Sequence, residues 1–225
     1  MKELSNMGSR DDRLQKEKRM EKKSIFKEYI EPIIIAVLIA LFVRSFVIQA
    51  FKIPSSSMEP TLLVGDYLLV NKFLYGLRIP FTDKKILSFK KPHRGDIIVF
   101  IFPKDRSKDF IKRVIGQEGE KISIVQNKIY VNDQLVEDPW GHFSDKNAWS
   151  RYLPSMESFG PVVVPKDSLF VLGDNRDNSQ DSRFWGFVHL DEVKGKAFII
   201  YFSLDWYAKQ VLDKVRWVRL GKLIR

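Results

Sequence analysis

Hydrophobic and polar positions divide the chain into one long apolar segment and a longer region of short apolar runs. The segment YIEPIIIAVLIALFVRSFVIQ, residues 29–49, would span about 31 Å as a helix, which matches the core of a bilayer. Two ionisable residues fall within it. Glu31 can sit among lipid headgroups at one end, and Arg44 can extend its side chain toward the other interface. The pattern predicts a transmembrane helix over 29–49.

Two alternatives stay open for this segment. Its uninterrupted apolar run, residues 32–43, has only 12 residues, a length that also suits a buried core helix. A removable leader is the second alternative. The long charged region before the segment and the lack of an Ala-x-Ala-like site after it favour a retained anchor instead.

Beyond residue 50, apolar runs of strand length recur between turn residues. KISIVQNKIYVNDQLV alternates apolar and polar residues around Asn127 and again around Asn132 and Asp133, as an antiparallel meander does. The stretch 137–165, with two Trp and four Pro, is typical of an irregular insertion. We therefore expect residues 50–225 to form one mainly β, largely antiparallel domain. Its predicted strands are 67–71, 96–102, 121–126, 128–131, 168–172 and 196–202.

Charge around the apolar segment predicts its direction. Residues 10–28 carry eight Lys or Arg, whereas residues 51–70 carry only Lys52. Because basic flanks stay in the cytoplasm, we expect residues 1–28 to form a basic cytoplasmic tail and the β domain to lie outside the cytoplasm. The net charge of +10 comes with no helix-turn-helix, zinc-finger or RNA-binding pattern, so no nucleic-acid partner is expected.

A serine cluster follows the predicted anchor directly. FKIPSSSMEPTL begins at Phe51, and the eight residues from Gln49 to Ser57 reach at most about 28 Å, so Ser57 would lie near the membrane surface. Alone, such a cluster is typical of a solvated turn. A nucleophilic serine would need a base to activate it.

Lysine is a better candidate for that base than histidine. His93, His142 and His189 lack a motif that would pair one of them with a serine and a carboxylate. A buried lysine with a lowered pKa can take the proton instead. Lys112, in DFIKRVIG, lies in an apolar, strand-like stretch, while Arg113 is excluded as a base by its permanent charge. A solvated surface position for Lys112 is the alternative.

A third segment, GDNRDNSQDSRFWG, covers residues 173–186. A calcium loop is excluded, because Arg176 would stand where an oxygen ligand is required and the terminal glutamate is missing. The alternative to a catalytic role is a stiff loop held by Asp-Arg pairs and Asx turns. Cysteine is absent, which removes disulfides, thiolate zinc sites and cysteine nucleophiles. We expect no metal and no cofactor.

In this order after an apolar segment, PSSSMEPTL, FIKRV and GDNRDNSQDSRFWG resemble segments of bacterial type I signal peptidases, the membrane-bound Ser-Lys proteases that release exported proteins. RGDIIVF, residues 94–100, matches a fourth family segment, and the match covers roughly residues 30–202. Ser56 stands where many relatives have glycine. The resemblance implies a single N-terminal transmembrane helix followed by a largely antiparallel β catalytic domain, with an apolar surface that rests on the membrane.

The resemblance also implies roles for individual residues. Ser57 corresponds to the nucleophile and Lys112 to the general base, while Ser55 corresponds to the oxyanion-hole serine and Ser179 to the serine that orients the lysine. Two supporting ion pairs are implied, Asp181 with Arg183 and Asp174 with Arg113. The family cleaves after small residues in an Ala-x-Ala pattern. Candidates to line the pockets that select them, with core packing as the alternative, are Ile53, Pro54, Met58, Leu62, Phe110 and Ile111.

The function implied is cleavage of signal peptides from exported preproteins by a monomer in the bacterial cytoplasmic membrane. One alternative is a Ser-Lys protease that cleaves itself or one dedicated partner. Another is a non-catalytic, membrane-anchored binding domain whose Asp-Arg loop is scaffold. The basic C-terminal stretch 206–225 is expected either to contact anionic lipid or to be solvated or packed on the sheet.

Overall fold

The computed structural model describes residues 26–78, 85–86, 89–143, 158–208, 210 and 212–224. The chain divides into two compact units, residues 1–45 and residues 46–225, which we call the anchor and the body. Each unit is described by itself. Most of the expected cytoplasmic tail, residues 1–25, lies outside the described residues.

The described part of the anchor is one apolar helix. Helix α2 comprises Glu31–Phe42, and π-helical turns flank it at Phe26–Ile30 and Val43–Val47. The continuous span Lys27–Val47 has 21 residues and is, among the described residues, the one helix long and apolar enough to cross a membrane. None of the α2 side chains is buried. A helix that is apolar all round and unburied by protein suits lipid, not water.

The helix ends two residues before the predicted boundary at residue 49. Ile48 and Gln49 begin strand β1 (Ile48–Lys52), because their backbones pair with Asn71 and Val70 of strand β2 (Asp66–Asn71). Short apolar runs do not distinguish a strand from the last turn of an apolar helix. The tertiary pairing with β2 therefore sets the boundary.

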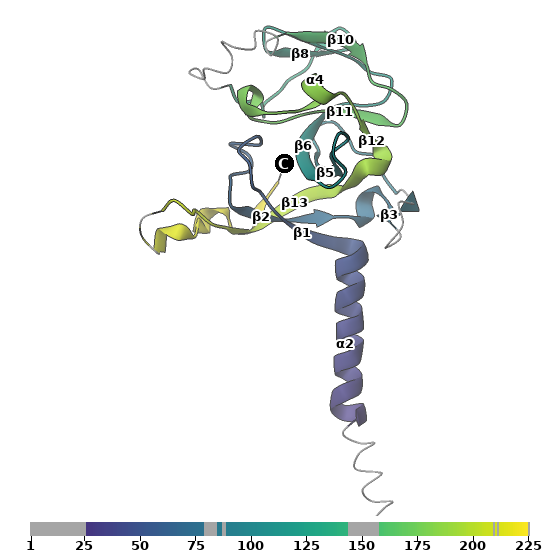
Figure 1. Cartoon of the computed structure of the whole chain (residues 1–225), viewed down its shortest axis with the longest axis vertical. Coiled ribbons are helices and arrows are strands. Elements are labelled where there is room, and N and C mark those ends of the chain that lie inside the picture. Colours follow the sequence, from purple (N-terminus) through teal and green to yellow (C-terminus); the bar gives the residue numbers. More distant parts are fainter. Residues whose placement is uncertain are drawn as a thin grey trace, which may run out of the picture. The chain divides into compact units, whose positions relative to one another are not determined.

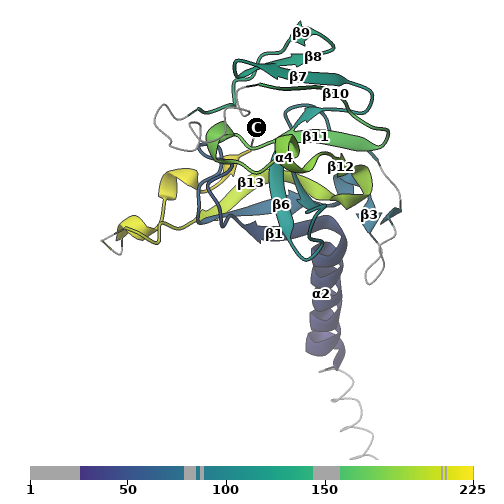
Figure 2. The same ribbon diagram turned by 45° about the horizontal axis from the view of Figure 1, so that its top comes forward.

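The body is built on a large antiparallel sheet (Figures 1 and 2). Among the described residues its strand order is β1-β2-β13-β5-β6-β11-β12, and β14 pairs with β13. Six predicted strands of the chain are present, each within a few residues of its expected ends. The further bounds in this sheet are β5 Ile97–Ile101, β6 Asp109–Gly116, β11 Ser168–Leu172, β12 Val188–His189, β13 Val193–Ser203 and β14 Lys222–Leu223.

Strand β5 explains the position of the core. All five of its residues are buried, because Ile97 and Val99 pack on one face of the sheet and Ile98 and Phe100 on the other. A continuous apolar run is what a strand covered on both faces requires. The neighbouring strand β6 is therefore also covered by protein along most of its length.

A second sheet carries the predicted meander, with strand order β10-β7-β8-β9 among the described residues. Its strands are β7 Lys121–Val125, β8 Lys128–Val131, β9 Gln134–Leu135 and β10 Phe159–Val163. Gln126 and Asn127 join β7 to β8, and Asn132 and Asp133 join β8 to β9, all four with positive φ. Paired positive φ values are typical of the two-residue turns that match strand twist.

The predicted irregular insertion, residues 137–165, needs correction. Its end forms β10, which pairs with β7 through Phe159 with Ile124 and Val162 with Ile122. The Gly160-Pro161 pair disguised this strand in the sequence, because the dipeptide is typical of a turn. Pro161 is tolerated since β10 lies at the edge of the sheet. Residues 144–157 of the expected insertion lie outside the described residues.

Short elements complete the body. Helix α4 (Ser182–Trp185) begins at Asp181, whose carboxylate accepts a hydrogen bond from the Arg183 backbone N–H. Strands β3 (Leu77–Arg78) and β4 (Lys85–Ile86) form a small hairpin. Single 3-10 turns occur at Phe73–Tyr75, Arg176–Asn178, Leu190–Glu192, Leu212–Lys214 and Trp217–Arg219.

The basic C-terminal stretch is partly packed on the large sheet. Arg219 pairs with the fully buried Asp66 through two hydrogen bonds of 3.0 and 2.5 Å, and Ile224 joins the core. By contrast, Trp217 and Val218 are 67% and 94% exposed. The stretch therefore combines a buried electrostatic attachment with an exposed apolar surface.

Candidate active site

Lys112 lies in the middle of β6, opposite Ile98 of β5. Only 3% of it is exposed, so its amine lies in a largely apolar interior. Burial penalises the charged form of an amine. It lowers the pKa of Lys112 from 10.5 to about 8, although the nearby Asp181 and Asp174 carboxylates act in the opposite direction.

Ser57 belongs to the loop between β1 and β2, and the segment after β11 holds that loop in place. The Asn175 N–H donates to the Ser57 carbonyl at 3.1 Å, and the Asn175 side chain donates to the Ser56 carbonyl at 3.1 Å. Gly173 permits this close approach. A Cβ at residue 173 would lie 2.4 Å from the Ser57 carbonyl oxygen and 2.2 Å from Ser179 Oγ. The two segments can approach this closely only with glycine at 173.

The two segments bring the predicted pair together. Lys112 Nζ and Ser57 Oγ lie 2.6 Å apart, joined by a buried hydrogen bond. Ser57 itself is 9% exposed. A hydroxyl within hydrogen-bond reach of an amine whose pKa is about 8 has the geometry of a nucleophile and its base.

The two other predicted serines surround this pair. Ser55 Oγ lies 3.4 Å from Ser57 Oγ. Ser179 is 4% exposed, and its hydroxyl has no hydrogen-bond partner among the residues that the structure describes. A buried hydroxyl without a partner is uncommon in folded proteins and is often found at a functional site.

A buried ion pair supports the lysine strand. Arg113 forks onto Asp174 through hydrogen bonds of 2.8 and 2.7 Å, and both side chains are fully buried. Thr61 donates a further bond of 2.5 Å to Asp174, and the Trp140 ring lies 4.4 Å from the Arg113 guanidinium carbon. This predicted pair therefore joins β6, the serine loop and the segment after β11.

The second predicted pair fixes the start of α4. Arg183 donates to Asp181 at 2.8 and 2.9 Å, and Asp181 also accepts the Gly173 N–H at 3.1 Å. A third pair, which the sequence analysis missed, joins Arg176 to Asp138, and Arg176 also donates to the Gly173 carbonyl at 3.0 Å. The Asp-Arg loop is thus a scaffold that holds Gly173 beside Ser57.

A cavity of about 720 Å³ opens beside the Ser57 and Lys112 side chains. Three of the predicted pocket residues, Pro54, Phe110 and Ile111, line it. The structure differs for the other three. Ile53, Met58 and Leu62 are at most 2% exposed and do not line this cavity, because they pack with β2 and β13 in the core.

Aromatic side chains that were not predicted form one wall of this cavity. Phe102 stacks on Phe110 with 4.2 Å between ring centroids, and Trp185 meets Phe102 edge to face. Phe184 also lines the cavity. The signal available in the sequence was the Phe184-Trp185 pair at the end of an otherwise polar loop.

One further contact concerns Ser56, which replaces the glycine of many relatives. Its hydroxyl accepts a 2.8 Å hydrogen bond from the Asn178 side chain. The substitution therefore adds a link between the serine loop and the Asp-Arg loop. No group of three His, Asp or Glu side chains among the described residues could hold a metal ion.

Comparison with known proteins points in one direction. A family model described as "Signal peptidase, peptidase S26" matches residues 26–202. A signal peptidase I from Pseudomonas aeruginosa is 35% identical over 234 residues, which cover 90% of this chain and 81% of that protein. One from Aquifex aeolicus is 36% identical over 230 residues, covering 79% of this chain and 84% of that protein. A crystal structure of a signal peptidase I from Enterococcus faecalis is 30% identical, with a TM-score of 0.40, covering 48% of this chain and 97% of that one.

Proposed function

We propose, given that the chain belongs to the signal peptidase family, peptidase S26, that Ser57 and Lys112 form its catalytic dyad. Family membership makes the protein a serine peptidase that acts on the signal peptides of exported preproteins. The observation that carries the proposal for the dyad is the 2.6 Å hydrogen bond between the buried Lys112 amine and the Ser57 hydroxyl.

The dyad would act by acyl transfer in two steps. Neutral Lys112 takes the proton of Ser57 as its oxygen attacks the scissile carbonyl, and the protonated amine then gives that proton to the leaving nitrogen. The signal peptide remains as an ester on Ser57. A water molecule, deprotonated by Lys112, attacks this ester and releases the signal peptide with a new carboxylate, while the proton returns to Ser57. The lowered pKa of Lys112 supports this role, since the base must start neutral.

The serines beside the dyad would support the two tetrahedral intermediates. The Ser57 backbone N–H and the Ser55 hydroxyl are the proposed donors to the oxyanion, and losing one such donor typically costs about 2.7–4 kcal/mol of barrier. The partnerless hydroxyl of Ser179 is the proposed orienting group for Lys112. Both assignments agree with burial of these side chains around the cavity.

Selection of small residues would occur in the cavity beside the dyad. Pro54 and Ile111 present apolar surface there, and the stacked rings of Phe102 and Phe110 restrict its width. A shallow apolar site bounded by rigid rings favours small side chains over large ones on steric grounds. Cleavage after an Ala-x-Ala pattern is therefore the proposed specificity.

The anchor helix would hold the body at the outer face of the bacterial cytoplasmic membrane. Many Lys and Arg residues precede the helix and one basic residue, Lys52, occurs in 51–70, which supports a cytoplasmic N-terminus. The exposed aromatic residues Trp206, Tyr207 and Trp217 would add contacts with the lipid surface. The proposed working form is a monomer.

The experiment uses the full chain in liposomes and a panel of unrelated preproteins with Ala-x-Ala sites. We expect every member to be cleaved directly after the second Ala, as read from the N-terminal sequence of the product. Cleavage of a single member, or of the chain itself alone, would favour a dedicated or self-cleaving protease. An acylating active-site probe that labels wild type but not Ser57→Ala would exclude a non-catalytic binding domain.

A further inference from the structure

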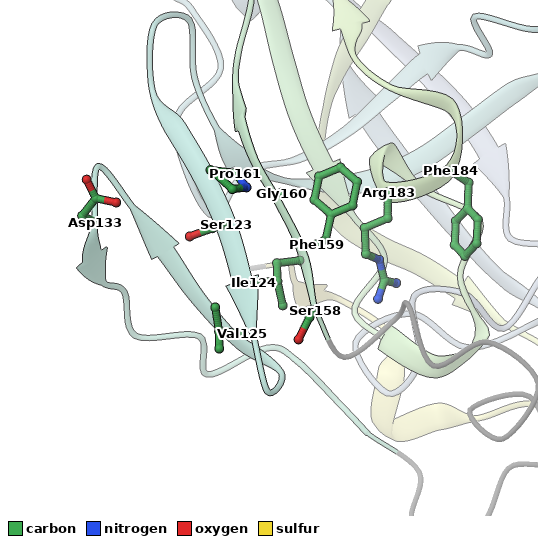
Figure 3. A pocket seen from close by; sticks show the side chains of 10 residues that line it. All are labelled: Ser123, Ile124, Val125, Asp133, Ser158, Phe159, Gly160, Pro161, Arg183 and Phe184. Atoms are coloured by element: carbon green, nitrogen blue, oxygen red, sulfur yellow. The ribbon is translucent and has the colours of Figure 1, made fainter.

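The four-stranded sheet carries a second cavity, of about 640 Å³, on the side that faces α4 (Figure 3). Figure 3 shows the apolar side chains of Ile124, Val125 and Phe159 along one side and Arg183 and Phe184 of α4 on the other. Ser123 and Ser158 add hydroxyl groups. None of these residues has a role in the proposed dyad chemistry except Arg183, which holds Asp181.

Phe184 lines both this cavity and the cavity beside Ser57 and Lys112, so the second cavity continues the first. The charged groups around the second cavity already have partners. Arg183 is paired with Asp181, and Asp133 is paired with Lys121 at 2.6 Å. The surface on offer is therefore apolar with hydroxyl groups and nearly neutral, which suits a polypeptide segment better than a phosphate or another strongly charged ligand.

The position of the second cavity within the body gives the direction of such a segment. The four-stranded sheet and β1 lie at opposite ends of the body, with β5, β6 and β11 between them (Figures 1 and 2). Strand β1 begins at the residue after the apolar helix ends, so chain connectivity keeps the β1 end close to the bilayer. A signal peptide approaches from the bilayer, and the mature part of the preprotein therefore leads toward the four-stranded sheet.

We propose that the second cavity binds the mature segment of the preprotein, the residues that follow the scissile bond, with an apolar side chain packed against Val125, Phe159 and Phe184. The inference rests on the proposed function. About ten extended residues span roughly 33 Å, which is most of the ~40 Å diameter of a compact body of this size. The first ten residues of the mature segment are thus long enough to reach the cavity.

The test compares the full-length enzyme in liposomes on three peptides that share one Ala-x-Ala site. The short peptide has two residues after the bond. The long peptide has ten, including two leucines, and the third peptide is extended by eight residues on the signal side instead. The variants are Val125→Asp, Val125→Leu and, as a matched control, Val163→Asp. Val163 is 60% exposed in β10 of the same sheet but does not line the cavity.

We expect wild type to cleave the long peptide with a kcat/KM about tenfold above that of the short one, mostly through KM, since burying one apolar side chain is worth about this factor. In Val125→Asp the ratio should fall to about one, whereas Val125→Leu and Val163→Asp should keep it. An unchanged ratio in Val125→Asp, or a loss only for the peptide extended on the signal side, would overturn the inference. Failure of wild type to cleave any of the three would contradict the proposed function as well. Thermal unfolding of both Asp variants checks that each is folded.

Discussion

Among single residues, Lys112 carries the most chemical information. Its amine is buried in β6, and desolvation is the main reason why its pKa falls to about 8. The two carboxylates of Asp174 and Asp181 limit that fall, because each already has an arginine partner but still favours a positive charge nearby. The structure thus keeps a base that is partly neutral near physiological pH.

The first prediction concerns pH. Because only the neutral amine can accept the Ser57 proton, kcat/KM should rise tenfold per pH unit below about 8 and level off above it. Stopped-assay rates on one peptide from pH 6 to 10 measure this acid limb. A limb centred near the ordinary lysine pKa of about 10.4 would contradict the burial argument.

The second prediction concerns the buried pair beside the dyad. Asp174→Asn should lower the free energy of unfolding by about 3–5 kcal/mol, because it leaves the Arg113 guanidinium buried without a counter-charge. Urea unfolding measures the loss. Lys91→Ala is the control, since its partner Glu118 and Lys91 itself are exposed and such pairs contribute about 0–1 kcal/mol. Equal effects of the two variants would show that the buried pair has no special weight.

Residue types were easier to predict than distances. The sequence identified Ser57, Lys112 and both Asp-Arg pairs by motif and order, but their separation depends on how the serine loop approaches Gly173. Three expected pocket residues lie in the core because apolar residues next to a buried loop satisfy both interpretations equally well. Burial by β2 and β13, which local sequence does not reveal, decided the matter.

At the scale of elements, turn chemistry transferred well from sequence to structure. The Asn127 and Asn132-Asp133 signals mark the two tight turns of the meander. Strand β10 was missed because its Gly-Pro pair hides the alternation that pairs it with β7. The end of the apolar helix was missed for a related reason, since Ile48 suits a helix and a strand equally.

The third prediction tests the first of these turns. Asn127 has a φ of 65°, a left-handed conformation that costs most residues about 1–2 kcal/mol. Asn127→Val should therefore destabilise the body by about that amount, while Asn127→Gly should be neutral or slightly stabilising. Thermal unfolding compares them. Lys128→Val, one residue later in extended β8, should cause no loss, and an equal loss there would reject the turn argument.

At the scale of the whole molecule, the exposed aromatic residues near the C-terminus predict contact with lipid. Trp206 is 58% exposed and Trp217 67%, while Arg219 and Ile224 attach the same stretch to the core. A rigidly attached surface can place aromatic rings at headgroup depth at little cost in conformational entropy.

The fourth prediction follows from that surface. In liposomes with bromine-labelled lipid, tryptophan fluorescence of the full chain should be quenched, and the Trp206→Phe, Trp217→Phe double variant should lose most of the quenching. Trp140→Phe is the control, because Trp140 packs against the buried Arg113. Quenching that persists in the double variant would place the lipid contact elsewhere.

The most direct test of the account is cleavage of one Ala-x-Ala preprotein by wild type, Ser57→Ala and Lys112→Met, with Ser107→Ala and Lys128→Met as surface controls. Both control residues are exposed. The account predicts no detectable product from either dyad variant, wild-type rates from both controls, and an unchanged folded structure by circular dichroism in all four. Measurable turnover by folded Ser57→Ala or Lys112→Met would contradict the assignment of the dyad.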